Sequence, residues 1–139
     1  MHLLDTDTLS HLWVRHERVI QRAADVDDTE LGVTSITKAE ILRRRCENLL
    51  KAETAEEVRK AQQRFDRSEQ QLARLMIVPF DEAAAKQLGR LSQVDRLKKI
   101  GRADLLIASV TLANDATLVT RNLKHFRQVP NLKAVNWVD

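Results

Sequence analysis

The chain has 139 residues, of which 43% are hydrophobic and 31% charged, which is ordinary for one folded domain with a real core. No apolar run approaches the roughly 20 residues that cross a bilayer, and the first residues do not form a signal peptide, so we expect a cytoplasmic protein without a membrane segment. One cysteine excludes an internal disulfide, and a net charge of +3 is weak evidence for an anionic partner.

Five short runs rich in apolar and β-branched residues predict strands. In chain order they cover residues 3–6, 31–36, 76–80, 116–120 and 133–137. Segments with helical spacing lie between them. This alternation predicts a single α/β domain over residues 1–139, with a central, mostly parallel five-stranded sheet flanked by helices. In such sheets, ligands bind beyond the carboxyl ends of the strands.

The predicted helices differ in how deeply they should be buried. Residues 41–50 indicate one helix, and residues 54–75 place apolar side chains on one helical face with charged residues between them. Asp81 is an N-cap for the next helix. Residues 103–115 are apolar on most sides, which predicts a buried helix.

The excess of positive charge is concentrated in one segment. Residues 86–102 hold six Lys or Arg side chains against one acid, Asp95. A stretch of this kind is typical of a solvated helix face and equally of an edge that binds phosphate groups. The sequence leaves both interpretations open.

Four acids lie next to predicted strand ends or helix starts. Asp5 and Asp7 follow the first strand, Glu40 follows the second, and Asp104 opens the apolar helix that precedes the fourth. Asp5 directly follows an apolar run and should be partly buried, whereas the other three have an alternative role in helix capping. Asp7 fits an N-cap for a helix from Thr8, Asp104 fits a cap of its own helix, and Thr37 to Glu40 fits a capping box.

Taken as a group, these acids indicate a metal site. Three carboxylates brought close together repel, so that one takes up a proton or a cation neutralises them. Carboxylate oxygens suit Mg²⁺ or Mn²⁺. Such ions support hydrolysis of phosphodiester bonds, with Lys and Arg side chains holding the nucleic-acid backbone.

Four stretches of the sequence resemble the PIN-domain family, and most of all the toxin ribonucleases of VapBC-type toxin–antitoxin pairs. They are "LLDTDTLSHL", "VTSITKAEIL", "DLLIASVTLANDATLVTRNLKHF" and "VPNLKAVNW", which occur in the family's order over nearly the whole chain. The resemblance implies a PIN-like fold with an acidic pocket that binds Mg²⁺ or Mn²⁺. It also implies cleavage of RNA, a homodimer, and inhibition by a cognate antitoxin protein whose tail enters the acidic groove.

The resemblance assigns roles to individual residues. The three core acids match Asp5, Glu40 and Asp104, which are the expected catalytic residues and metal ligands. Asp7 stands where the family often has Asn or Asp, and Thr120 and Asn122 match polar residues after the fourth core strand. We expect further metal contacts from Asp7, Asn122 and His125, and contacts to RNA from Arg102, Thr120, Arg121 and Lys124.

One position departs from the family pattern. The family usually places a fourth acid just before the Phe of the last motif, and here that position is His125. A histidine binds Mn²⁺ but is a poor ligand for Mg²⁺. Catalysis then relies on one ion or on Asp7, unless His125 is a surface residue at a tolerant site.

Two other functions stay open at this point. One is a catalytically weak PIN-like module that only binds RNA or a protein. The other is a receiver-type phosphoacceptor domain, which is also doubly wound and binds Mg²⁺ beside acids that follow its first strand. The receiver needs an Asp at the end of the third strand, where Asp81 stands, but it leaves Glu40 and Asp104 without a role.

Overall fold

A computed structural model describes residues 1–139. Five strands form one sheet in the order β3-β2-β1-β4-β5, and every neighbouring pair runs parallel. The strands are β1 (His2–Leu4), β2 (Leu31–Thr34), β3 (Met76–Val78), β4 (Thr117–Val119) and β5 (Lys133–Val135). Each lies at one of the five predicted runs, so the predicted α/β architecture is confirmed, with a sheet that is parallel throughout.

Helices occupy the segments between the strands. They are α1 (Thr6–Trp13), α2 (Glu17–Val26), α3 (Ser35–Lys51), α4 (Ala55–Ala73), α5 (Glu82–Leu91), α6 (Arg102–Ala113) and α7 (Leu123–Phe126), with a short 3₁₀ turn η1 (Asp95–Lys99) before α6. The predicted cap is confirmed, because the Asp81 side chain accepts a hydrogen bond from the backbone N–H of Ala84 at 3.0 Å. None of these helices is long and apolar enough to cross a membrane.

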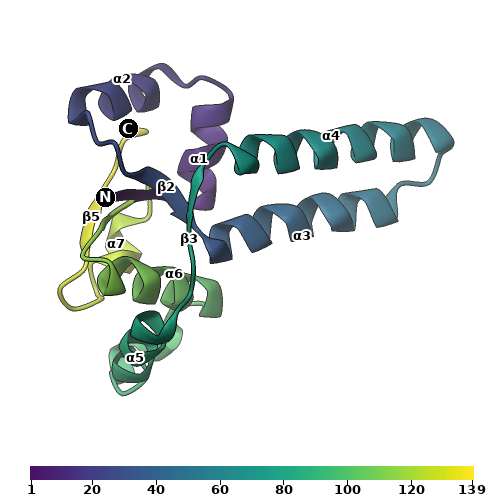
Figure 1. Cartoon of the computed structure of the whole chain (residues 1–139). Helices are drawn as coiled ribbons and strands as arrows, with labels where there is room; N and C mark the ends of the chain where they lie inside the picture. The colour runs from purple at the N-terminus through teal and green to yellow at the C-terminus, as the bar shows by residue number, and fades with distance from the viewer.

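The two faces of the sheet are covered by different helices. Alternating residues of the central strands point to opposite sides: Leu4, Val33 and Val119 enter one core with α1, α2 and the C-terminal residues, whereas Leu118 enters a second core with α6 and α7. Figure 1 shows α1 and α2 on one side of the sheet and α5, α6 and α7 on the other. As predicted, α6 is the buried helix, with residues 107–111 all buried.

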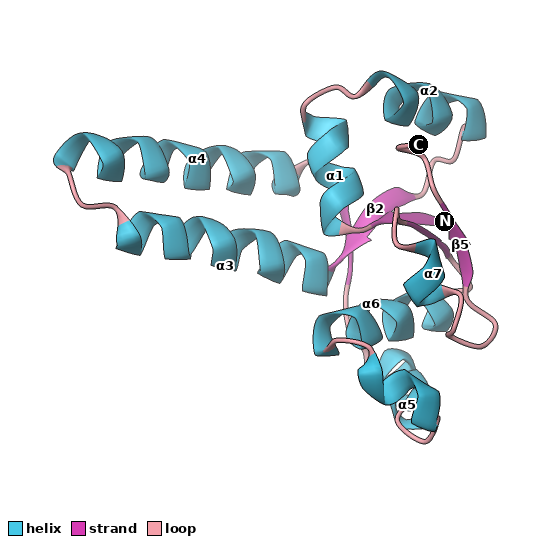
Figure 2. Ribbon diagram, turned by 180° about the vertical axis from the view of Figure 1, so that it is seen from behind, coloured by secondary structure: helices cyan, strands magenta, loops and turns pink.

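The hairpin of α3 and α4 extends away from this body (Figure 2). Only its base joins the core, through Ile41 of α3 and Leu72 of α4. Farther out, a narrow seam holds the two helices together, where the Nε of Arg45 donates a hydrogen bond to the buried Oγ of Ser68 at 3.1 Å. The base of α3 therefore lies at the carboxyl end of β2, and the tip of the hairpin is exposed to solvent.

The strand order excludes the receiver interpretation. Receiver-type domains have the order 2-1-3-4-5, which places the third strand in the middle of the sheet. Here β3 is an edge strand, and β1 lies between β2 and β4. Asp81 caps α5, and the Lys133 ammonium binds Asp115 at 3.2 Å, so neither residue forms a phosphoacceptor site.

Candidate active site

An open cleft of about 330 Å³ lies where the carboxyl ends of β1 and β2 meet the start of α6. Three separate elements supply acids to it. Asp5 follows β1, Glu40 lies on α3 after β2, and Asp104 lies in the first turn of α6. The complete lining is Asp5, Thr6, Asp7, Ser10, Glu40, Arg44, Asp104, Ile107 and Asn122.

Asp5 is fixed at the junction of β1 and α1. Its Oδ1 accepts a hydrogen bond from the Thr8 N–H at 2.8 Å, and its own N–H donates to the Val119 carbonyl of β4 at 3.0 Å. Asp5 is therefore the N-cap of α1. The prediction that Asp7 caps this helix is wrong, because α1 begins at Thr6 and places Asp7 in its first turn, exposed to solvent.

Glu40 reaches the cleft because α3 begins earlier than predicted. Thr34 is the N-cap, and its Oγ1 accepts a hydrogen bond from the Thr37 N–H at 3.1 Å. The capping box expected over Thr37 to Glu40 is therefore wrong, and Glu40 lies in the second turn of the helix. There the Thr6 hydroxyl donates to Oε1 of Glu40 at 3.0 Å.

Asp104 does not cap its helix. Gly101 precedes α6 without a side-chain cap, and Asp104 lies half-buried in the first turn. Its Oδ2 is 3.2 Å from Nε2 of His125. Burial raises the pKa of the Asp104 carboxyl and the nearby charge of Asp5 raises it further, while His125 partly opposes both effects. Asp5 and Asp104 are thus close enough for their charges to repel.

The cleft has the donor types that a hard divalent cation prefers. Carboxylates from three elements line it, together with Asn122, whose side chain carries an amide oxygen. No three His, Cys, Asp or Glu side chains yet converge closely enough to share one ion. Each acid is instead engaged by a neighbour within the chain, through Thr8 for Asp5, Thr6 for Glu40 and His125 for Asp104.

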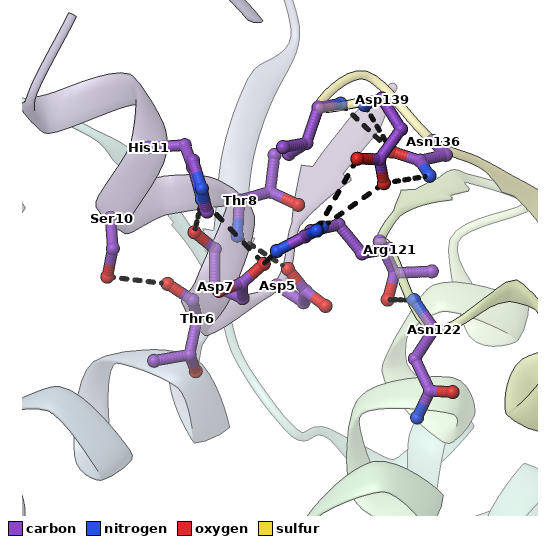
Figure 3. Close-up of polar contacts among 12 residues, drawn as sticks. Asp5, Thr6, Asp7, Thr8, Ser10, His11, Arg121, Asn122, Asn136 and Asp139 are labelled. Atoms are coloured by element: carbon purple, nitrogen blue, oxygen red, sulfur yellow. Dashed lines mark hydrogen bonds and ion pairs between the residues drawn. The ribbon is translucent and has the colours of Figure 1, made fainter. Parts of the chain in front are cut away.

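A second network lies beside the cleft (Figure 3), where Arg121 and Asp139 line an adjoining hollow together with Asp5, Asp7 and Asn122. The Nε of Arg121 lies 3.2 Å from Oδ2 of Asp139, and its Nη1 lies 3.9 Å from Oδ2 of Asp7. Asn136 also donates to Asp139, at 3.0 Å. These contacts raise the pKa of the Arg121 guanidinium, chiefly through the hydrogen bond to Asp139. Arg121 is thus already paired with acids of the same chain.

The other residues expected to contact RNA lie away from the cleft. Thr120 is fully buried, and its Oγ1 accepts a hydrogen bond from the Asn122 N–H at 3.0 Å. The predicted contact between Thr120 and RNA is therefore wrong, and Thr120 instead shapes the loop after β4. Arg102 and Lys124 are exposed but do not line the cleft.

The basic segment at 86–102 covers α5 and η1 instead of the edge of the cleft. Two of its cations are engaged locally. Lys98 pairs with Asp95 at 3.2 Å, and the Nε of Arg96 donates to the Gln128 carbonyl at 3.1 Å. The interpretation as a solvated helix face agrees with this arrangement.

Four residues of the cleft were not identified from the sequence as site residues: Thr6, Ser10, Arg44 and Ile107. Helical spacing contains the signal that would have found two of them. Ser10 lies one turn after Thr6, to whose carbonyl its hydroxyl donates at 2.9 Å, and Arg44 lies one turn after Glu40. Residues three or four apart share a helix face, so Ser10 lies on the side of Asp7 and Arg44 lies on the side of Glu40.

Comparison with known proteins places this arrangement in a family. A model of the PIN domain matches residues 2–132. The chain belongs to the PIN-domain family. Divalent-metal dependence is the general property of the ribonucleases in this family, which agrees with the carboxylates found in the cleft of this PIN domain.

Individual relatives of this PIN domain are similar in sequence or in fold. Ribonuclease VapC2 of Rickettsia felis is 44% identical over 68 residues, which cover 48% of this chain and about half, 51%, of that relative's length. The structure of VapBC2 from Rickettsia felis bound to a DNA fragment from their promoter contains a similar chain, with 27% identity, a TM-score of 0.74 and 98% of each chain covered. VapBC-1 from nontypeable Haemophilus influenzae shares the fold, with 23% identity, a TM-score of 0.79, and 99% and 98% of the two chains covered.

Proposed function

We propose that this chain is a metal-dependent endoribonuclease that acts as the toxin of a toxin–antitoxin pair. The observation that carries the proposal is the placement of Asp5, Glu40 and Asp104, from three separate elements, along one cleft of a PIN fold. The similarity to Ribonuclease VapC2 supports the ribonuclease activity. The likeness to a chain in the VapBC2 complex supports an antitoxin as partner.

The three acids would hold one or two Mg²⁺ or Mn²⁺ ions, with Asp7, Asn122 and His125 as further ligands at the rim. When bound, such an ion polarises the scissile phosphate and makes a water molecule more acidic. The residues of the chain supply the remaining functions. The Thr6 hydroxyl orients Glu40 and the Thr8 N–H holds Asp5. One of the cleft carboxylates would accept a proton from the attacking water.

Attack by water on phosphorus leaves a 5′-phosphate on one product and a 3′-hydroxyl on the other. A nucleophile from the RNA itself would instead leave a 2′,3′-cyclic phosphate. Analysis of the product ends therefore tests the chemistry independently of the rate. A cyclic phosphate would contradict the attack by water proposed here.

The partners follow from the same cleft. RNA is the substrate, and the enzyme acts in the cytoplasm, where this substrate is available. A Lys or Arg side chain of the antitoxin would neutralise the acids in place of the metal, because charge-assisted hydrogen bonds to carboxylates are strong. The active form is a homodimer, as the family resemblance implies.

The test is cleavage of an end-labelled, structured RNA by the purified chain with Mn²⁺, Mg²⁺ or EDTA. Asp5→Asn and Asp104→Asn should each abolish cleavage, and EDTA should do the same. Asp95→Asn is the matched control, because Asp95 is an exposed acid on η1 and its loss should leave cleavage unchanged. Cleavage that survives both cleft substitutions would contradict the proposed site.

Two observations favour a second candidate function, a PIN-like module that binds RNA or a protein without cleaving RNA. The acids do not yet converge on one point, and His125 stands beside Asp104. The same assay separates the two functions. Binding of RNA without cleavage in Mn²⁺, by folded protein, would identify the binding module.

A further inference from the structure

Arg44 is the only cationic side chain that lines the acid cleft. Every other charged residue of that lining is an aspartate or glutamate. Arg44 lies on α3 four residues after Glu40, and thus on the same face of the helix. It therefore extends the acid site along α3.

The neighbours of Arg44 in the "RRR" stretch are engaged within the chain, whereas Arg44 is not. Arg43 lies 3.8 Å from a carboxylate oxygen of Glu47, and Arg45 donates to Ser68 at 3.1 Å. Arg44 forms no ion pair or side-chain hydrogen bond, although Glu40 lies one turn away. An oxygen of Glu40 instead accepts the Thr6 hydroxyl. The guanidinium of Arg44 is thus free to bind an anion.

Other cations are less available to a substrate in the cleft. Arg121 is paired with Asp139 and lies near Asp7. Arg102 and Lys124 lie outside the cleft lining. An RNA backbone that approaches the acids meets strong repulsion, and a single well-placed cation then has a large effect on where the strand binds.

We infer that Arg44 binds a backbone phosphate of the RNA strand that occupies the acid cleft. This inference rests on the proposed ribonuclease function and adds a substrate-binding residue to it. The planar guanidinium donates two parallel hydrogen bonds to a phosphate, which fixes the position of the strand as well as attracting it. A contact of this kind positions the backbone without reading the base sequence.

The test compares Arg44→Gln with Arg43→Gln, since both remove one positive charge from adjacent positions of the same helix. Binding of a fluorescently labelled single-stranded RNA is measured by anisotropy in the Asp104→Asn background with Mg²⁺, so that no cleavage interferes. Arg44→Gln should weaken binding by about tenfold and reduce the slope of log affinity against log salt by about 1. Arg43→Gln should stay within about twofold, and Arg44→Lys should recover part of the loss.

Cleavage by the otherwise unchanged enzyme gives a second readout. Arg44→Gln should raise KM for RNA by about the same factor as it weakens binding, and Arg43→Gln should not. Equal RNA affinity of the two glutamine variants, or no RNA binding at all, overturns the inference. If the wild-type chain binds RNA but cleaves none under any metal condition, the proposed function fails, while the difference between the two variants still decides the role of Arg44.

Discussion

The surroundings of Asp104 act on the pKa of its carboxyl in opposite directions. Burial and the charge of Asp5 both raise the pKa of its carboxyl, and His125, 3.2 Å away, counteracts them in part. A raised pKa means that the folded state disfavours the charged form of Asp104. The site therefore holds a carboxylate at some cost to stability, which is typical of a group selected for its chemistry.

Asp104→Asn should stabilise the metal-free protein while reducing cleavage more than about 100-fold. At neutral pH, the charged Asp104 carboxylate lowers the free energy of unfolding of the wild type. This loss of stability disappears as the pH falls through the raised pKa of the folded state, because the carboxyl then becomes protonated. The gain of the variant over the wild type, measured by thermal unfolding in EDTA, should therefore shrink at acidic pH. A lower melting temperature for Asp104→Asn at neutral pH would contradict this account.

His125→Asp should increase cleavage supported by Mg²⁺ if metal occupancy limits the rate. The substitution replaces a poor Mg²⁺ ligand with a carboxylate oxygen beside Asp104. Cleavage rates are compared over a series of Mg²⁺ and Mn²⁺ concentrations, and the gain should be larger with Mg²⁺. His16→Asp is a useful control, because His16 is the N-cap residue of α2 and lies outside the cleft lining. No gain over this control would remove the idea that His125 limits metal binding.

At the level of elements, the sequence predicted which segments form helices better than where they begin. The predicted cap at Asp81 is confirmed, but α1 and α3 start two and three residues earlier than the caps at Asp7 and Thr37 implied. Several polar residues near a helix start can each serve as a cap, and the connection from the preceding strand decides among them. For α3 this choice frees Glu40 from capping and places it in the cleft.

The tip of the α3–α4 hairpin offers a test of local stability. Thr54 and Glu57 form a capping box at the start of α4, in which the Thr54 hydroxyl accepts from the Glu57 N–H at 3.1 Å. Thr54→Ala should lower the free energy of unfolding by about 1 kcal/mol, and Thr54→Ser should retain it. Urea titration measures the difference, and hydrogen exchange should show faster opening of the first turn of α4.

The same Thr54→Ala variant should cleave RNA at the wild-type rate. The turn between α3 and α4 lies at the end of the hairpin that is farthest from the sheet (Figure 1). Loss of cleavage together with unchanged global stability would instead show that the hairpin tip takes part in substrate binding.

Across the whole molecule, the parallel sheet separates two groups of polar residues. The acids of the cleft lie at the carboxyl ends of the strands, as expected from sequence once a parallel sheet is assumed. The order of the strands could not be derived in this way, because pairing depends on contacts between distant segments. The sequence likewise could not predict that Arg44 is unpaired and that Arg121 is paired. Both depend on which side chains of other segments lie next to these residues in the folded chain.

The opposite end of the sheet holds the other polar group. Asp28 accepts a hydrogen bond from His2 and lies 3.1 Å from the N-terminal ammonium of Met1. The His2 ring stacks on buried Trp137 with 5.5 Å between ring centroids. These contacts fix the start of β1 against the C-terminal segment. The pKa of Asp28 is lowered from 3.8 to about 2, first by the hydrogen bond from His2 and next by that from the Glu30 N–H.

Asp28→Asn should therefore destabilise the protein in a pH-dependent way without impairing cleavage. Because the folded-state pKa is depressed, the ionised carboxylate contributes stability above pH 3.8, and this contribution disappears as the pH falls through about 2. Asp28 is partly exposed, so we expect a difference of about 1 kcal/mol between wild type and variant at pH 5. Urea titrations between pH 2 and 6 measure how the difference in the free energy of unfolding decreases as the pH falls. A difference in stability that stays constant over that range would mean that Asp28 acts through packing and not through its charge. Altered cleavage at neutral pH would show that the two ends of the sheet are coupled.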